Sequence, residues 1–177
     1  MVQVIRQGIQ DMARKLSGHI TGGHAVMVRD ARLDDLGSMT GLLGELFRIE
    51  ADFTPDVRRQ RLGLATLMKS PSATLLVAVA GEDVAGEKIV GMCTLQPMIS
   101  TAEGGTVGIV EDLVVSHAWR GRGIGSMLLE AIEATARRQH MSRLQLLCDL
   151  DNIPAMHFYK LHAWTRTHLL TLRKTFG

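Results

Sequence analysis

The chain of 177 residues contains only two cysteines, Cys93 and Cys148, and neither belongs to a Cys-x-x-Cys pair. Its seven histidines are scattered without a ligand spacing, so the sequence predicts neither a disulfide framework nor a metal site. Both cysteines lie in apolar runs, where free thiols behave as small apolar residues. A reducing compartment is the simplest interpretation.

Long apolar runs, a signal-peptide pattern and a large charge of one sign are also missing. No apolar run reaches the roughly eighteen residues of a transmembrane helix. Asp11, Arg14 and Lys15 stand where a signal peptide would carry its apolar region. The net charge of +2 gives no reason to expect a nucleic acid or a membrane as partner. We therefore expect a cytoplasmic protein.

The length and the 46% hydrophobic content are those of one globular domain. Apolar spacing and glycine breaks predict a helical appendage over residues 1–24, followed by a domain over 25–177. In that domain we expect a strand at 25–29, helices at 33–49 and from Pro55 to Ser70, strands at 74–80, 88–98 and 106–115, a helix at 124–139, a strand at 143–148, a helix at 153–161 and a strand at 164–172. The helix connection makes the strands at 106–115 and 143–148 parallel.

The segment from Val110 to Leu129 reads as a strand, a glycine-rich loop and the start of a helix. Glycines at 121, 123 and 125 let the backbone approach a ligand closely, and Arg120 and Arg122 add positive charge. A helix N-terminus offers unpaired N–H groups and a dipole that favours anions. The pattern indicates a site for a phosphorylated cofactor, although a loop that only connects strand to helix remains the alternative.

Two common phosphate-binding loops are excluded by the same residues. A P-loop requires Gly-Lys-Ser/Thr after its glycines, and the segment has none. A dinucleotide loop would read Gly-x-Gly-x-x-Gly, but counting from Gly121 places Ser126 at the third glycine.

What the segment does contain is Arg120-x-x-Gly123-x-Gly125, and a second segment reads Asn152-x-x-Ala155-x-x-Phe158-Tyr159. Both resemble motifs of the GNAT acetyltransferase superfamily, and the first is similar to its acyl-CoA pyrophosphate loop. The element order over residues 25–172 is also similar to that of the family. The resemblance implies an α/β (α+β) fold with a mixed sheet of six to seven strands flanked by helices, splayed between strands 106–115 and 143–148.

The resemblance further implies acetyl-CoA as acyl donor, with no metal. The pantetheine arm would enter the gap and pair with strand backbone at Leu113, Val114 and Val115. The cofactor-binding residues implied in this way are Leu113, Val114, Val115, Arg120, Gly121, Arg122, Gly123, Ile124, Gly125, Ser126, Asn152 and Tyr159.

Two residues are candidates for proton transfer. Glu111, a carboxylate on a mostly apolar strand, is the expected general base, and its alternative role is structural. Its neighbour Asp112 points to the other face and is expected to be structural. Tyr159, the only tyrosine, is expected to protonate the departing CoA thiolate; the alternative is an aromatic core residue.

The family usually continues with Leu-Gly-Phe or Leu-Gly-Trp, whereas this chain has His162-Ala163-Trp164. Glycine there would end the helix in the left-handed conformation, in which alanine costs roughly 1 kcal/mol. The local turn is therefore in question.

The acceptor side is expected between the first two helices of the domain, at Glu45–Asp56. Glu50, Asp52 and Phe53 could hold a cationic amine there, or the acidic residues could be helix caps and solvated groups.

The sequence predicts an N-acetyltransferase that moves an acetyl group to a small-molecule amine by direct attack in a ternary complex. A covalent route is not expected, because Cys148 lacks a paired base. Two alternatives are a protein or peptide acetyltransferase and a CoA-binding sensor without turnover. The chain is also expected to be able to form a homodimer.

Overall fold

The computed structural model describes residues 19–21, 24–50, 52–81 and 86–176 of the chain. These residues belong to two compact units that divide between Leu147 and Cys148. Residues 1–18 and 22–23 of the predicted helical appendage lie outside the described residues. Residues 19–21, at the end of the predicted appendage, form a short strand that pairs with the sheet.

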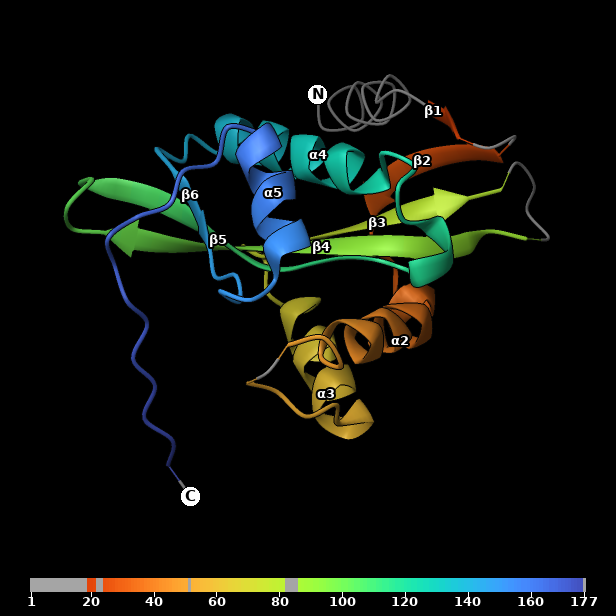
Figure 1. Ribbon diagram of the computed structural model, residues 1–177, viewed down its shortest axis with the longest axis horizontal. Helices are drawn as coiled ribbons and strands as arrows, with labels where there is room; N and C mark the ends of the chain where they lie inside the picture. The colour runs from red at the N-terminus through yellow and green to blue at the C-terminus, as the bar shows by residue number, and fades with distance from the viewer. Residues whose placement is uncertain (1–18, 22–23, 51, 82–85, 177) are drawn as a thin grey trace, which may run out of the picture. The chain divides into compact units, whose positions relative to one another are not determined.

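The first unit is built on a mixed sheet with the strand order β1-β2-β3-β4-β5-β6 (Figure 1). Its strands are β1 (His19–Thr21), β2 (His24–Asp30), β3 (Thr74–Ala80), β4 (Lys88–Ser100), β5 (Gly105–Val115) and β6 (Leu144–Leu146). Neighbours from β1 to β5 run antiparallel, and β5 and β6 run parallel. The parallel pair confirms the prediction made from the helical connection between these two strands.

Helices cover both faces of this sheet. Helices α2 (Leu36–Leu46) and α3 (Val57–Leu67) lie below it in Figure 1, and α4 (Ile124–Arg138) lies above it. The core under α2 and α3 joins Met39 and Leu64 of these helices to Val77, Met92 and Val114 of three adjacent strands. Buried apolar side chains thus fix α2 and α3 against the face of the sheet that includes Val114, near the end of β5.

A buried ion pair fixes the connection from β2 to α2. The Arg29 guanidinium donates to both carboxylate oxygens of Asp35, at 2.7 and 3.0 Å, and the backbone N–H of Arg32 donates to the same carboxylate. Burial alone would raise the pKa of Asp35, but these hydrogen bonds outweigh it and hold that pKa below its ordinary value. The predicted helix at 33–49 accordingly starts as one 3-10 turn, η1 (Leu33–Asp35), before α2.

The second unit contains helix α5 (Ile153–Leu161), within the bounds that the sequence predicts. The strand predicted at 164–172 is wrong, because residues 163–176 have no regular secondary structure. A strand needs a neighbour to accept and donate its backbone hydrogen bonds. The apolar side chains of Leu169, Leu170 and Leu172 are instead 78%, 81% and 87% exposed.

Candidate functional site

The glycine-rich loop ends at an open helix N-terminus. Gly121 and Gly123 have φ of 72° and 77°, in the left-handed region, and a Cβ at either position would meet no atom within 4 Å. Gly123 is the N-cap of α4 and provides no side-chain cap. The first backbone N–H groups of α4 therefore receive no hydrogen bond from the side chain of the N-cap residue, and they lie at the positive end of the helix dipole.

Both arginines of the loop are exposed and have defined positions. Arg120 Nε donates to the carbonyl oxygen of Val115 at 3.0 Å, which holds this guanidinium beside the last residue of β5. The guanidinium of Arg122 lies 4.8 Å from the ring centre of Trp119, in the 3-10 turn η2 (His117–Trp119). The loop thus places two cations at the start of α4, as a bound pyrophosphate would require.

Glu45 near the end of α2 holds the other side of this loop. Its carboxylate accepts hydrogen bonds from Ser116 Oγ at 3.2 Å and from the backbone N–H of His117 at 2.9 Å. The sequence placed Glu45 in the acidic acceptor region, but this carboxylate joins α2 to the end of β5. The bond spans more than 70 residues of sequence, so no local pattern could reveal it.

Strand β5 is irregular where the catalytic base was predicted. Cys93 pairs with Leu113 and Leu95 with Val110, so Glu111 and Asp112 together stand opposite the single residue Thr94. This is a β-bulge, which interrupts the strict alternation of side chains expected for the strand. Glu111 is exposed at the bulge, whereas Asp112 is only 7% exposed.

The edge of β5 that faces β6 is only partly used. β6 pairs with Gly108, Ile109 and Val110, while β4 pairs with β5 as far as Val115. Beyond Val110, no described strand pairs with this edge of β5. The backbone from Leu113 to Val115 therefore has an edge without a strand partner, on which the carbonyl of Val115 accepts a hydrogen bond from Arg120 Nε.

Asp112 is a buried acid with one polar partner. Thr94 Oγ1 donates to Asp112 Oδ2 at 2.9 Å and accepts from the Asp112 backbone N–H at 3.1 Å. Burial raises the pKa of Asp112 from 3.8 to about 6; the Thr94 hydrogen bond opposes this rise, and the charge of Glu111 adds to it. The predicted structural role of Asp112 agrees with these contacts, although the carboxylate itself is in an unfavourable site.

Asp112→Asn should therefore stabilise the protein at alkaline pH and not at pH 4. Below pH 3.8, the pKa of Asp112 in the unfolded chain, the folded and unfolded states both hold the proton. As the pH rises from there to about 6, the unfolded chain releases its proton first, so the free energy of unfolding falls. At about 1.4 kcal/mol for each pKa unit, the cost above pH 6 is roughly 3 kcal/mol. Denaturant unfolding at pH 4 and pH 8 measures this difference. Glu130→Gln, which removes an exposed carboxylate on α4, is the control, and an Asp112→Asn protein less stable than wild type at pH 8 would contradict the account.

In the second unit, the residues of the Asn-x-x-Ala-x-x-Phe-Tyr motif organise α5. Asn152 Oδ1 accepts from the backbone N–H of Ala155 at 3.1 Å and caps the helix, as the sequence predicts for Asp151 or Asn152. The ring of half-buried Tyr159 lies 5.3 Å from Phe158 and 5.9 Å from Trp164 between centres. These contacts fix the direction of the only tyrosine in the chain.

The helix that carries Tyr159 ends in the turn that alanine makes unfavourable. Ala163 has φ of 61°, the left-handed conformation that glycine adopts in the family motif. The turn forms despite the Cβ of Ala163, and the backbone N–H of Ala163 donates to the carbonyl oxygen of Lys160 at 3.1 Å. The substitution therefore leaves the turn intact at an expected cost of roughly 1 kcal/mol.

The residues predicted to line the acceptor side lie between the end of α2 and the start of α3. Phe53 is 47% exposed and its ring centre lies 5.2 Å from that of Phe47, after the end of α2. Glu50 is half-buried and Asp52 is exposed, and both already take part in interactions. Asp56 caps α3 by accepting from the backbone N–H groups of Arg58 and Arg59. The capping role left open by the sequence is thus observed at Asp56.

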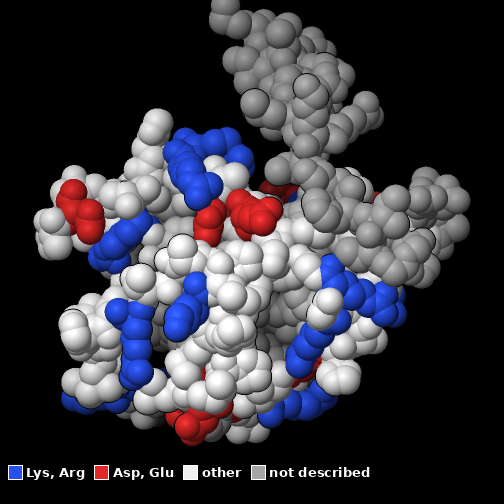
Figure 2. Space-filling model, turned by 45° about the horizontal axis from the view of Figure 1, so that its top comes forward, with Lys and Arg blue, Asp and Glu red and all other residues white. Residues whose placement is uncertain are grey.

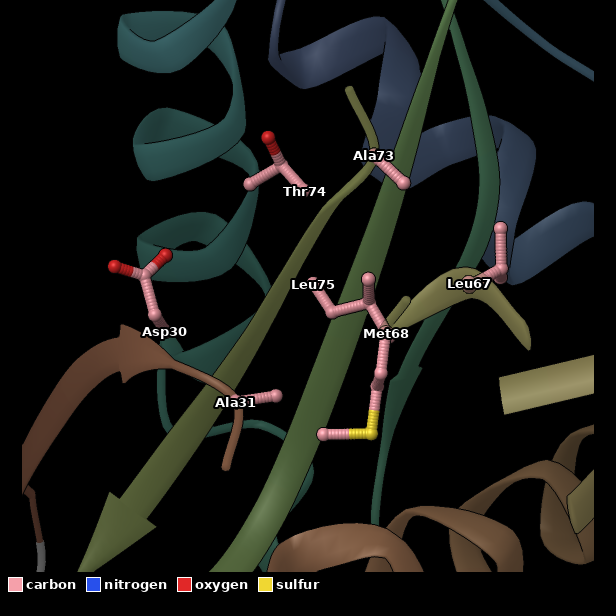
Figure 3. Close-up of a pocket in the computed structure, with 7 residues that line it drawn as sticks. All are labelled: Asp30, Ala31, Leu67, Met68, Ala73, Thr74 and Leu75. Carbon is pink, nitrogen blue, oxygen red and sulfur yellow. The ribbon is translucent and has the colours of Figure 1, made fainter. Parts of the chain in front are cut away.

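A shallow pocket elsewhere in the first unit contains none of the predicted site residues (Figure 3). It is lined by Asp30, Ala31, Leu67, Met68, Ala73, Thr74 and Leu75. On the face drawn in Figure 2, basic and acidic side chains form separate small groups, in keeping with the net charge of +2.

The described residues offer no cluster of three metal-binding side chains, and none of their helices has the length and apolar character needed to cross a bilayer. Cys93 is fully buried, and burial together with the charge of Asp112 raises the pKa of its thiol far above the ordinary value. A thiol in this state is a poor nucleophile.

An uncapped helix start, two arginines and a strand edge without a strand partner are features that suit an extended anionic ligand. Comparison with known proteins specifies the class. The family model described as acetyltransferase (GNAT) family matches residues 43–163, and the chain belongs to this family. It is an acetyltransferase, and enzymes of this family use acetyl-CoA as donor.

One curated relative agrees with this assignment, and two solved structures share the fold. An aminoalkylphosphonate N-acetyltransferase of Salmonella typhimurium is 27% identical over 141 residues, which is 80% of this chain and 86% of that protein. A transcriptional regulator from Bacillus halodurans C-125 matches 85% of this chain and 99% of its own, with 24% identity and a TM-score of 0.70. An aminoglycoside acetyltransferase from a soil metagenome, solved with trehalose, matches 86% of this chain and 97% of its own, with 18% identity and a TM-score of 0.67. The two structural likenesses show the fold alone.

Proposed function

We propose that this acetyltransferase moves the acetyl group of acetyl-CoA to the amine of a small molecule by direct attack in a ternary complex. The observation that carries the proposal is the open N-terminus of α4 beside the free edge of β5. The first would hold the pyrophosphate of CoA through backbone N–H groups and the arginines at 120 and 122. The second would pair with the amide groups of pantetheine, as an added strand does.

The proposed transfer has no covalent enzyme intermediate. The amine nitrogen attacks the thioester carbonyl, a backbone N–H of β5 stabilises the oxyanion, and collapse breaks the C–S bond and expels the CoA thiolate. Glu111 would take the proton that the amine loses, directly or through water, and Tyr159 would give a proton to the thiolate. The exposure of Glu111 at the bulge and the partial exposure of Tyr159 fit these roles, and the inert state of Cys93 fits direct attack.

Small amines are the proposed acceptors because two acetyltransferases of this fold are named for them, an aminoalkylphosphonate and an aminoglycoside enzyme. Glu50, Asp52 and Phe53 are proposed to line the acceptor side. A protein or peptide acceptor and a CoA-binding sensor are the competing functions.

Release of the CoA thiol should separate these functions. Purified protein is mixed with acetyl-CoA and, in turn, with aminoalkylphosphonates, amino sugars, amino acids, diamines and lysine-bearing peptides. We expect thiol release with at least one small amine at a rate far above that with any peptide. A peptide as best acceptor would replace the proposal with the protein-modifying function, and binding of acetyl-CoA without thiol release for any amine would favour the sensor.

A further inference from the structure

The 3-10 turn η2, which leads from β5 to the glycine-rich loop, is capped by a side chain from another helix. Ser116 precedes the turn, and a serine there commonly accepts from the backbone N–H two or three residues later. Ser116 makes no such bond. Its hydroxyl donates instead to Glu45 Oε1 at 3.2 Å, and Glu45 Oε2 accepts from the backbone N–H of His117, the first residue of η2, at 2.9 Å. Glu45 therefore caps η2 from α2.

Glu45 stands on a rigid support. It is the penultimate residue of α2, whose Leu42 and Leu43 are buried in the same core as Val114 of β5. Helix α2 covers one face of the sheet, and the turn leads to α4 on the other face (Figure 1). The carboxylate thus reaches from a packed helix to the point where the chain leaves β5, and it holds the turn in one position.

The positions of both loop arginines depend on this turn. The guanidinium of Arg122 lies 4.8 Å from the ring centre of Trp119, the last residue of η2. Arg120 follows directly: its backbone N–H donates to the carbonyl of His117 at 3.4 Å, and its Nε donates to the carbonyl of Val115 at 3.0 Å. A shift of His117 would move the backbone of Arg120 and the ring beside Arg122. The cap on η2 therefore sets where the two cations stand.

The strand before the turn is held without this cap. Val115 pairs with Gly91 of β4, and the backbone N–H of Ser116 donates to the carbonyl of Val90 at 2.9 Å. Loss of the Glu45 hydrogen bonds would therefore release the turn while β5 keeps its place in the sheet. This separates two parts of the proposed donor site, the strand edge for pantetheine and the loop for the phosphates.

A carboxylate close to a site for phosphates is unfavourable on charge alone. Glu45 contacts His117, a near neighbour of Arg120 in the sequence, and its negative charge would repel the pyrophosphate. Electrostatics alone predicts that removal of this carboxylate strengthens acetyl-CoA binding. A positioning role predicts the opposite, because the arginines would lose their fixed places. The sign of the change in affinity therefore distinguishes the two.

We propose that Glu45 is a positioning residue for the donor: it caps η2 and thereby holds Arg120 and Arg122 where the phosphates of acetyl-CoA meet them. This inference rests on the proposed function, which places the pyrophosphate at the start of α4. Glu45 itself contacts neither substrate and takes no part in proton transfer. It therefore does not belong to the acceptor side, where the sequence placed it.

The test compares the full chain with Glu45→Met, which keeps the length of the side chain and loses both acceptor oxygens, and with Glu45→Gln. The glutamine is equally uncharged, but its oxygen can accept from the His117 N–H and its NH2 group can donate to Ser116 Oγ. Glu130→Met, at an exposed glutamate of α4, is the matched control.

Two donors are used, acetyl-CoA and S-acetylpantetheine, which has the thioester and the pantetheine arm but no phosphate. Calorimetry measures the Kd of acetyl-CoA without any acceptor. Initial rates with the best amine of the acceptor panel give kcat and kcat/KM for each donor.

We expect Glu45→Met to raise the Kd of acetyl-CoA about tenfold, since a lost hydrogen bond to a charged group contributes roughly that factor. Glu45→Gln should recover most of the affinity, and Glu130→Met should match wild type. In Glu45→Met, kcat at saturating acetyl-CoA should stay within about threefold of wild type. Its kcat/KM with S-acetylpantetheine should not change, because this donor has no phosphate for the arginines to hold.

An unchanged or lower Kd in Glu45→Met would overturn the inference. Equal Kd values in Glu45→Met and Glu45→Gln would assign the effect to charge, and an equal loss with both donors would assign it to a general disturbance of the fold; either result would also overturn it. Equal use of both donors by wild type would remove the proposed phosphate site and this inference together. If no amine accepts the acetyl group, the proposed function fails, and the Kd values of the Glu45 variants still decide the inference.

Discussion

Gly123→Asp is expected to abolish acetyl-CoA binding and reduce transfer at least a hundredfold. The new carboxylate would stand at the N-cap of α4, where the pyrophosphate is proposed to lie, and its charge and bulk would oppose the ligand. Fold stability should change little beyond the cost of the left-handed backbone, because a Cβ at this position meets no neighbouring atom. Thermal shift with millimolar acetyl-CoA measures the binding: wild type should be stabilised by mass action and the variant should not.

Gly104→Asp is a matched control for this experiment. Gly104 also has a left-handed φ, 65°, and open space around its Cβ position, but it lies just before β5 begins, at the opposite end of that strand from the loop. The control should carry a similar backbone cost and retain the acetyl-CoA shift. Equal shifts in wild type and Gly123→Asp would exclude the start of α4 as the cofactor site.

Tyr159→Phe is expected to lower kcat on the order of tenfold to a thousandfold while acetyl-CoA affinity stays within a few-fold. The ring contacts with Phe158 and Trp164 do not depend on the hydroxyl, so the turn after α5 should persist. The variant removes the hydroxyl and with it the proton that the phenol is proposed to give to the CoA thiolate. Steady-state kinetics with a donor-affinity measurement separates this result from a general loss of structure.

Glu111→Gln tests the other half of the proton path. Its rate should fall mainly at pH values where the acceptor amine is still protonated, because free amine needs less help from a base. A pH–rate profile shows whether the loss narrows as the pH rises. Unchanged turnover in both Tyr159→Phe and Glu111→Gln would mean that neither residue acts as acid or base.

Local sequence signals predicted most of the fold. The apolar run of β3 and the glycine-led start of α4 gave the right bounds, since burial and helix capping are encoded within a few neighbouring residues. The strand predicted near the C-terminus failed because residues that suit a strand form one only beside a partner. The parallel pairing of β5 and β6 was predictable because a helix connects them.

The site was less predictable where it depends on distant contacts. The loop from Arg120 to Ser126 and the helix cap at Asn152 could be predicted from sequence motifs. The hydrogen bonds of Glu45 to the end of β5 and the Thr94–Asp112 pair at the bulge both depend on tertiary packing. The homodimer and the cytoplasmic location stay predictions.

The most direct test of whether the acetyl group passes straight from acetyl-CoA to a small amine is a measurement of initial rates in which the concentrations of both substrates are varied. With the best acceptor of the panel, we expect intersecting double-reciprocal lines, one CoA thiol released per N-acetylated product, and no acetylated protein by mass spectrometry when the amine is omitted. Parallel lines together with a stable acetyl-enzyme would contradict direct transfer, and thiol release no faster than the acceptor-free blank for every amine would contradict the function itself.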